Sequence, residues 1–134
     1  MIVEGDNLIP IVTPEDVVRV RREVRTQAIA VGFSLVDQTK IVTAASEIAR
    51  NTIDYGGGGT LRIEALRHGV RRGVRLTFTD QGPGISDIKL ALTDGYSSGS
   101  GLGLDLGGAK RLSSEFDIQS TPGKGTIVTL ARWK

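Results

Sequence analysis

The sequence predicts an α+β domain in which helices cover one face of a mostly antiparallel sheet, a two-layer α/β sandwich. In the first part of the chain, apolar residues recur at helical spacing along two long stretches. Further along, strand-like runs alternate apolar and polar residues, and short glycine-containing turns join them in pairs. Helices combined with hairpins of this kind are expected to pack as two layers around one core.

The first expected element is a short edge strand at 7–12, because Pro10 inside the run argues against a central strand. A helix is expected to begin after Thr13, where a hydroxyl residue is followed by a proline and two acidic residues near the positive end of the helix dipole. Apolar residues then recur at helical spacing until Gly32 closes the helix.

A second helix is expected to follow. Ser34 or Asp37 can cap its start, and its apolar face repeats as far as about Tyr55, where the run Gly56 to Gly59 ends it. After it, the pattern predicts strands at 60–67 and 74–80, a short helical segment at 87–92, a Gly/Ser-rich loop at 95–101, a helix from about 102 to 112, and strands at 115–120 and 126–132.

Length and composition are those of one ordinary domain, expected to span residues 1–134. The chain has 39% hydrophobic and 24% charged residues, close to the globular average. It has no cysteine, which excludes disulfides and cysteine metal sites, and its one histidine, His68, argues against a structural zinc site. No apolar stretch has the length of a bilayer span and no signal peptide opens the chain, so we expect a cytoplasmic protein with no membrane partner.

The charge pattern does not indicate a nucleic-acid partner. The formal net charge is +2, and arginines gather in the ranges 19–25 and 62–75. Binding to nucleic acid needs such charge focused on one surface, with aromatic residues for stacking, and aromatics make up 4% of the chain. We therefore interpret both clusters as solvated faces of helices and strands, with a patch for an acidic protein partner as the second interpretation.

The second predicted helix carries a polar stripe. On a helix, Glu47, Arg50, Asn51 and Asp54 lie on one face, which by itself is typical of a solvated surface. Asn51 is a poor helix former in mid-helix, so its presence one turn after Glu47 favours a functional role. An amide oxygen suits Mg²⁺, which prefers oxygen ligands, and a carboxylate one turn away can orient or deprotonate a hydroxyl that attacks a γ-phosphate.

A second motif, Asp80-Gln81-Gly82-Pro83-Gly84, comes at the end of a predicted strand. Alone it is an ordinary turn. An aspartate there can, however, accept a hydrogen bond from the exocyclic amine of adenine, and the glycines let the base approach the backbone closely. Guanine has a carbonyl at the same position, so such an aspartate selects ATP over GTP.

A third motif is the Gly/Ser-rich run from Ser97 to Leu104, which leads into a helix. Helix N-termini with unpaired N–H groups attract phosphate, although a plain surface loop is about equally expected. The run is not a dinucleotide fingerprint, because Leu104 and Leu106 stand where the last glycine is needed. Residues 123–126 are not a P-loop either, since the spacing fails, and the protein-kinase H-R-D and D-F-G elements are absent.

In this order and spacing, the three motifs resemble those of the GHKL ATPase superfamily, which includes gyrase, Hsp90, histidine kinases and MutL and has the Bergerat fold. Glu47 to Asn51 is similar to its N-box, Asp80 to Gly84 to its first glycine box, and Gly99 to Gly103 to its ATP lid and second glycine box. Thr126 is similar to the later strand threonine that supports the adenine site. The resemblance implies an ATP site formed by Asn51, Asp80, Gly82, Gly84, Gly99, Gly101, Leu102, Gly103 and Thr126.

Within this superfamily the whole chain resembles the short serine/threonine kinases of the anti-sigma-factor type, above all the stressosome switch kinases. The resemblance implies one histidine-kinase-like ATPase domain, in which Asn51 ligates Mg²⁺, Asp80 binds adenine and Glu47 assists the acceptor hydroxyl. It also implies a STAS-domain antagonist as the phosphorylated partner, with a downstream effector such as a phosphatase, or a sigma subunit. The matching residues are Ala45 to Asn51, Asp80 to Ile85, Gly101 to Gly103, Lys110 to Leu112, and Arg132-Trp133.

Some residues depart from that pattern. Asp105 and Gly107 stand where switch kinases tend to have glycine and proline, and the run Gly56 to Gly59 is richer in glycine than usual. These departures concern ATP affinity and lid closure rather than the fold.

Two other functions are compatible with the same motifs. One is an anti-sigma factor, a binding module that sequesters a sigma subunit, but the short chain and short lid favour the switch kinase. The other is the ATPase half of a histidine kinase. His68 lies at the end of a strand-like run and is expected to be a surface residue rather than a phosphoacceptor.

Overall fold

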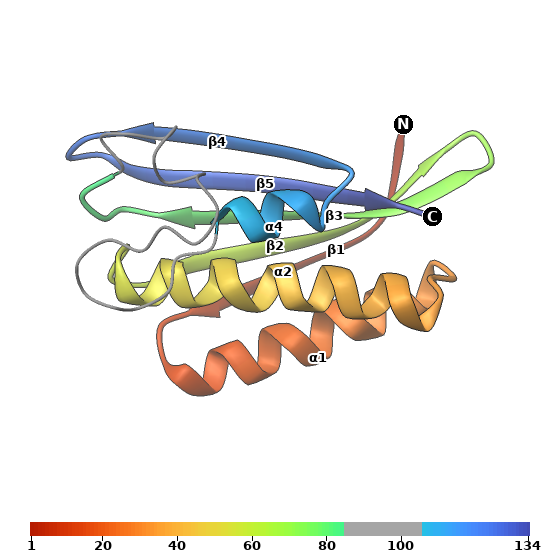
Figure 1. The fold of residues 1–134 in the computed structure, drawn as a ribbon, viewed down its shortest axis with the longest axis horizontal. Coiled ribbons are helices and arrows are strands. Elements are labelled where there is room, and N and C mark those ends of the chain that lie inside the picture. Colours follow the sequence, from red (N-terminus) through yellow and green to blue (C-terminus); the bar gives the residue numbers. More distant parts are fainter. Residues whose placement is uncertain (85–105) are drawn as a thin grey trace.

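The computed structural model describes residues 1–84 and 106–134, and Figure 1 shows their arrangement. No helix in these ranges is long and apolar enough to span a membrane. The elements are β1 (Ile2–Ile11), α1 (Pro14–Ala30), α2 (Leu35–Asp54), β2 (Gly59–His68), β3 (Arg71–Asp80), α4 (Leu106–Arg111), β4 (Glu115–Thr121) and β5 (Gly125–Trp133).

In the described ranges the strands form one five-stranded sheet in the order β1-β2-β3-β5-β4, and every neighbouring pair is antiparallel. The helices lie on one face of it (Figure 1). The predicted α+β fold, a mostly antiparallel sheet with helices on one face, is therefore confirmed. The segments predicted at 87–92 and 95–101 lie outside the described residues.

The first strand is longer than the predicted 7–12. It begins at Ile2, and its register against β2 shifts between Val3 and Gly5. Because of this irregularity, and because most of the strand is exposed, apolar and polar residues do not alternate in the way from which a strand is predicted. Pro10 lies in this strand at the edge of the sheet, as predicted, since proline cannot donate to a ladder and is disfavoured in central strands.

Both long helices begin where the sequence predicts. Ahead of α1, the Asp16 carboxylate accepts hydrogen bonds from the backbone N–H groups of Val12 (2.8 Å) and Thr13 (3.0 Å), and these bonds lower the pKa of Asp16. At the start of α2, Ser34 is the cap, because its Oγ accepts from the Asp37 N–H at 3.2 Å. These contacts satisfy backbone donors that the first turn of a helix leaves open.

The core lies between the helices and one face of the sheet. The buried residues of α2 are all small or aliphatic, so the helix packs close to the strands. Strand residues of the same face alternate with residues of the opposite, open face. The core includes Val20 and Val24 of α1, Ile41, Ala45 and Ile48 of α2, and Leu61, Ile63, Leu76, Phe78, Val128 and Leu130 of the sheet.

An ion pair joins α2 to the last strand. The Asp37 carboxylate accepts hydrogen bonds from the Arg132 guanidinium at 2.7 and 3.3 Å, and Arg132 also donates to the Leu112 carbonyl at 2.8 Å. The two charged side chains are 29% and 17% exposed, so solvent screens them only in part. Arg132 lowers the pKa of Asp37 below its ordinary value.

Replacing Asp37 by asparagine is expected to lower the free energy of unfolding by about 1 kcal/mol at neutral pH. Because the Asp37 pKa is lower in the folded than in the unfolded chain, its contribution is complete well above about pH 3.9 and is lost as the pH falls through the folded value. Urea denaturation of wild type and Asp37→Asn at pH 7 and in acid measures this, with Asp117→Asn, a change on the exposed side of β4, as control. Equal stabilities at pH 7 would contradict the prediction.

Candidate functional site

The structure divides the polar stripe predicted on α2. Glu47 and Asn51 are half-buried, whereas Arg50 and Asp54 are exposed. The exposure of the stripe therefore varies, because one side of it faces the body of the protein and the other side faces solvent. Glu47 and Asn51, one turn apart, are the two members that a ligand beside the sheet can reach together.

Asn51 has a buried polar atom whose hydrogen-bonding capacity is not used. Its Nδ2 is buried and has no hydrogen-bond partner among the described residues. Its backbone carbonyl, in contrast, accepts from the N–H groups of Tyr55 (2.9 Å) and Gly56 (3.3 Å) where the helix ends. An unsatisfied buried amide costs about 1–3 kcal/mol, and such an atom in a folded protein points to a bound water, ion or ligand.

Asp80 lies at the end of β3, between Gly59 of β2 and Thr126 of β5 in the sheet register. Its Oδ1 accepts a hydrogen bond from the Gly82 N–H at 2.9 Å. Within the described residues no donor lies on Oδ2, and the side chain is only partly exposed. One carboxylate oxygen is therefore held in place while the other can accept a hydrogen bond from a ligand.

Close glycine contacts bring the end of α2 against Asp80. A Cβ at Gly56 would lie 2.5 Å from both Cβ and Cγ of Asp80, and one at Gly82 would lie 2.6 Å from the Gly56 Cα. A Cβ at Gly84 would likewise lie 2.5 Å from the Thr121 carbonyl oxygen. Neighbouring backbone thus already fills the space beside Gly82 and Gly84. This packing alone requires glycine at both positions, whether or not an adenine base binds beside them.

Thr126 faces the same end of the sheet. Its side chain is buried, 8% exposed, and its residue pairs with Asp80 across the β3–β5 ladder. Its Oγ1 lies 2.9 Å from the Oγ of Ser120 on β4. No motif in the sequence marks Ser120. Only the pairing of Ser120 with Thr126 across the 121–125 turn could have indicated that it lies beside the site, and this pairing requires the hairpin register.

The predicted lid falls in the segment that the structure does not describe. Gly99, Gly101, Leu102 and Gly103 lie outside the described residues, as does Asp105. Gly107 is buried in α4.

The described side chains fit a magnesium nucleotide. No group of three or more histidine, cysteine or acidic residues capable of holding a metal occurs in the described ranges. Mg²⁺ does not need such a cage, because it keeps several waters and takes phosphate oxygens as ligands, so one amide oxygen suffices from the protein. Flipping the Asn51 side-chain amide exchanges its nitrogen and its oxygen, so the oxygen can take the unsatisfied position and face the metal. Asp80 supplies the acceptor that an adenine amine requires.

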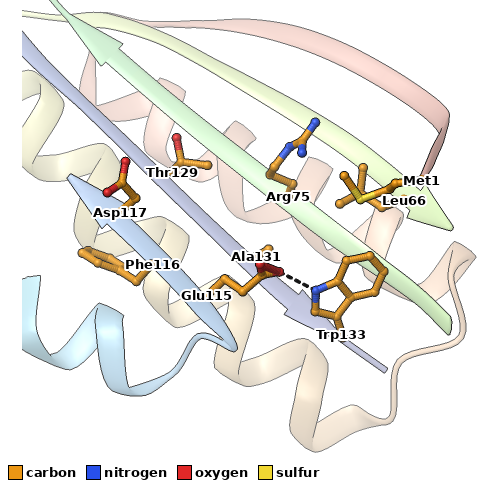
Figure 2. A pocket seen from close by; sticks show the side chains of 9 residues that line it. All are labelled: Met1, Leu66, Arg75, Glu115, Phe116, Asp117, Thr129, Ala131 and Trp133. Carbon is orange, nitrogen blue, oxygen red and sulfur yellow. Dashed lines mark hydrogen bonds between the residues drawn. The ribbon is translucent and has the colours of Figure 1, made fainter. Parts of the chain in front are cut away.

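A separate hollow of about 400 Å³ lies on the open face of the sheet (Figure 2). Its lining includes Arg75, Glu115 and Trp133, and the Trp133 Nε1–H donates to Glu115 at 2.6 Å. Arg75 donates two hydrogen bonds, of 2.9 and 3.0 Å, to the nearly buried carboxylate of Glu64. None of the predicted site residues lines this hollow, so we do not place the nucleotide there.

Comparison with known proteins gives matches across most of the chain. The family model described as "Histidine kinase-, DNA gyrase B-, and HSP90-like ATPase" matches residues 36–134. The serine/threonine-protein kinase RsbT of Bacillus subtilis (strain 168) is 42% identical over 123 residues, 92% of each chain. The anti-sigma F factor of Thermoanaerobacter sp. (strain X514) is 30% identical over 101 residues, 69% of this chain and 68% of its own.

Solved structures share the fold at lower identity. A chain with the RsbU and RsbW domains of a Mycobacterium tuberculosis protein matches 96% of this chain with a TM-score of 0.66 and 23% identity. The present chain covers 32% of that longer one. A chain of the SiaB–SiaC complex from Pseudomonas aeruginosa matches 98% of this chain, with a TM-score of 0.57 and 12% identity, and 91% of it is covered. At these identities the likeness supports the fold alone.

Proposed function

The chain belongs to the family of histidine kinase-, DNA gyrase B- and HSP90-like ATPases, and we propose that it is an ATP-dependent serine/threonine protein kinase that acts as a partner switch. In this proposal it phosphorylates a STAS-domain antagonist in a bacterial stress or signalling pathway, such as a stressosome. Its similarity to RsbT along 92% of both chains supports this function over that of more distant family members.

The observation that carries the proposal is the unsatisfied Asn51 amide on the helix whose end contacts Asp80. Asn51 is the proposed Mg²⁺ ligand, and Asp80 with Thr126 is the proposed adenine site. When bound, Mg²⁺ neutralises charge on the transferring phosphoryl group. Glu47, half-buried one turn before Asn51, would orient the acceptor hydroxyl and take its proton. Gly82 and Gly84 shape the loop after Asp80, and Gly99, Gly101, Leu102 and Gly103 are proposed to bind the phosphates.

Replacing Asp80 by asparagine is expected to weaken Mg–ATP binding roughly ten- to a hundredfold, which corresponds to about 1.5–3 kcal/mol for a charged hydrogen bond. Asparagine keeps the size but loses the charge, and its amide nitrogen is a donor where adenine also has one. Calorimetric titration of wild type and variant measures the loss, with Asp117→Asn as a matched control on the open face of the sheet. Wild type is also expected to prefer ATP to GTP, and equal binding of both would contradict Asp80 as the adenine reader.

A binding module is the second candidate function, because one relative of this chain is an anti-sigma factor. A sequestering protein holds a sigma subunit, and phosphorylation is then secondary. The similarity to that relative covers a smaller share of both chains than the similarity to RsbT. The switch kinase is therefore the function we propose first.

The two functions differ in how a partner complex responds to ATP. Affinity capture of the tagged chain without nucleotide, followed by addition of Mg–ATP, tests this difference. A switch kinase is expected to release a STAS-domain protein once that protein is phosphorylated. A complex with a sigma subunit that persists in Mg–ATP, with no STAS-domain protein captured, would favour the binding module.

A further inference from the structure

The arginines of the second basic cluster, residues 62–75, differ in how their charge is compensated. Arg62 donates hydrogen bonds of 2.6 and 2.8 Å to Asp6, and Arg75 donates two, of 2.9 and 3.0 Å, to Glu64. Each of these two guanidiniums has a carboxylate of its own, so little of its charge is left for a partner. The charge that remains lies at the end of the hairpin between β2 and β3.

Three arginines at this end, Arg67, Arg71 and Arg72, share one carboxylate in the described ranges. Arg67 and Arg72 lie 3.8 and 3.5 Å from the two oxygens of Glu4, which is longer than a good hydrogen bond. The Arg71 guanidinium lies 4.9 Å from the centre of the Trp133 ring instead. Nε of Arg72 is buried without a hydrogen-bond partner among the described residues. This small region thus has two positive charges in excess, as many as the formal net charge of the whole chain.

The hairpin tip, residues 67–72, also exposes apolar side chains. It extends beyond the helices at its end of the sheet (Figure 1). Val70, at the turn, is 100% exposed. Ile2, which pairs with Arg67 across the β1–β2 ladder, is 53% exposed. Apolar side chains beside arginines are typical of surfaces that bind another protein, where arginine is enriched.

The first basic cluster, residues 19–25, has no comparable excess of charge. It lies on α1, where three acidic residues accompany four arginines in the same helix. One of these arginines, Arg25, also donates to Gln38 at 3.1 Å. We therefore keep the interpretation of a solvated face for α1. The hairpin tip, in contrast, fits the second interpretation, a patch for an acidic partner.

We propose that the hairpin tip is a docking site for an acidic surface of a protein partner. Its three arginines pair with carboxylates of the partner, and Val70 contacts an apolar side chain there. The tip and Asp80 lie at opposite ends of β3, which at about 3.3 Å per residue puts them about 30 Å apart. That separation is several Debye lengths at physiological ionic strength, so the charge of a bound nucleotide does not alter docking. The inference goes beyond the proposed kinase site and does not depend on it.

Nucleic acid and anionic membranes fit the hairpin tip less well. Stacking on bases needs a free aromatic ring. The Trp133 ring already contacts Arg71, and a Cβ at Gly73 would lie 2.8 Å from it. Stable binding to a membrane surface needs the apolar face of a helix or a lipid anchor, whereas the turn of the hairpin offers one fully exposed valine. A protein is therefore the occupant to which we commit.

Photo-crosslinking locates the partner on the surface of the chain. The crosslinker p-benzoylphenylalanine replaces Val70, and in a matched control it replaces Val18, an apolar residue of α1 that is 54% exposed. Both proteins are produced and irradiated in the cells that normally make this chain, without added nucleotide, and crosslinked peptides are identified by mass spectrometry. The crosslinker at position 70 is expected to label a protein segment rich in aspartate and glutamate. The crosslinker at position 18 is expected not to label that segment.

The charge of the hairpin tip is tested with the labelled protein in purified form. Two variants each lose three positive charges: Arg67→Gln/Arg71→Gln/Arg72→Gln at the tip, and Arg19→Gln/Arg21→Gln/Arg22→Gln on α1. The tip variant is expected to associate at least about tenfold more slowly at low salt and to lose most of the salt dependence, because electrostatic steering raises association rates by about 10–10³-fold. The α1 variant is expected to stay within about threefold of wild type. Both are expected to bind Mg–ATP as wild type does.

Several outcomes would overturn the inference. Crosslinks from position 70 to lipid, nucleic acid or a second copy of this chain would show a different occupant, and so would labelling of a protein segment without acidic residues. Absence of any crosslink at position 70 overturns the inference as well. If the α1 variant associates as slowly as the tip variant, net charge rather than the tip steers binding. A wild type that binds no ATP overturns the proposed kinase but not this inference, since neither measurement uses nucleotide.

Thermal unfolding shows whether the tip variant keeps its stability. If it does not, Val70→Ser replaces it, because this substitution changes a fully exposed side chain at the turn. Loss of an apolar contact acts mainly on dissociation, so Val70→Ser is expected to dissociate from the labelled protein about tenfold faster. Unchanged dissociation of Val70→Ser would overturn the inference.

Discussion

Replacing Glu47 by alanine is expected to slow phosphoryl transfer by about 10²–10⁴-fold, the contribution of a general base, while Mg–ATP and the protein partner still bind. Transfer needs a positioned nucleophile and a group that takes its proton, whereas binding needs neither. Glu47 is suited to this role because it is half-buried one turn from Asn51 and has no ion-pair partner in the described ranges.

The matched control for Glu47→Ala is Asp54→Ala. Asp54 is the other carboxylate of the same helical stripe, but it is exposed and lies nearly two turns further on. Its replacement should leave the rate of transfer within a few-fold of wild type. Single-turnover assays at saturating Mg–ATP measure the chemical step for both variants. If Asp54→Ala is slow and Glu47→Ala is not, the assignment of the base to Glu47 is wrong.

Asn51→Ala is expected to abolish measurable Mg–ATP binding. Loss of an outer-shell partner of a metal site typically costs 10–100-fold in metal affinity, so a direct ligand should cost at least about a hundredfold. The same substitution should not destabilise the fold, because the Asn51 Nδ2 is buried without a described partner and alanine is the better helix former. Lower affinity with equal or higher stability is the combination expected of a residue retained for function.

Calorimetry of Mg–ATP binding and urea denaturation measure the two effects of Asn51→Ala. Asn7→Ala, at an exposed position of β1, is the control for loss of an asparagine side chain. A folded Asn51→Ala protein with unchanged affinity for Mg–ATP would mean that Asn51 is not the metal ligand. A variant that binds nothing because it has unfolded would show instead that the buried amide is structural.

The helices and most strands follow from local patterns in the sequence. The apolar spacing of α1 and α2 and the alternation in β2 and β3 are strong because each element buries one face against the same core. The start of β1 could not be predicted in this way. Most of its residues are exposed and its register shifts near Gly5, so no alternation marks the strand.

Predictions about the site were limited by contacts between distant segments. The sequence indicated that Asn51 and Asp80 act together, but it could not place Gly56 against Asp80 or pair Ser120 with Thr126. These contacts depend on how the end of α2 meets the sheet and on the β4–β5 register. The spacing of the stripe likewise gave no way to tell that Arg50 and Asp54 face solvent while Glu47 and Asn51 do not.

Transfer of the γ-phosphate itself tests most directly whether the chain is a switch kinase. Wild-type protein is incubated with γ-labelled Mg–ATP and the STAS-domain protein captured with it, and the modified residue is mapped by mass spectrometry. A switch kinase is expected to place label on one serine or threonine of the STAS-domain protein, and Glu47→Ala is expected to lose that label although the complex still forms. Absence of label on any captured STAS-domain protein, together with a sigma subunit held tightly in Mg–ATP, would contradict it.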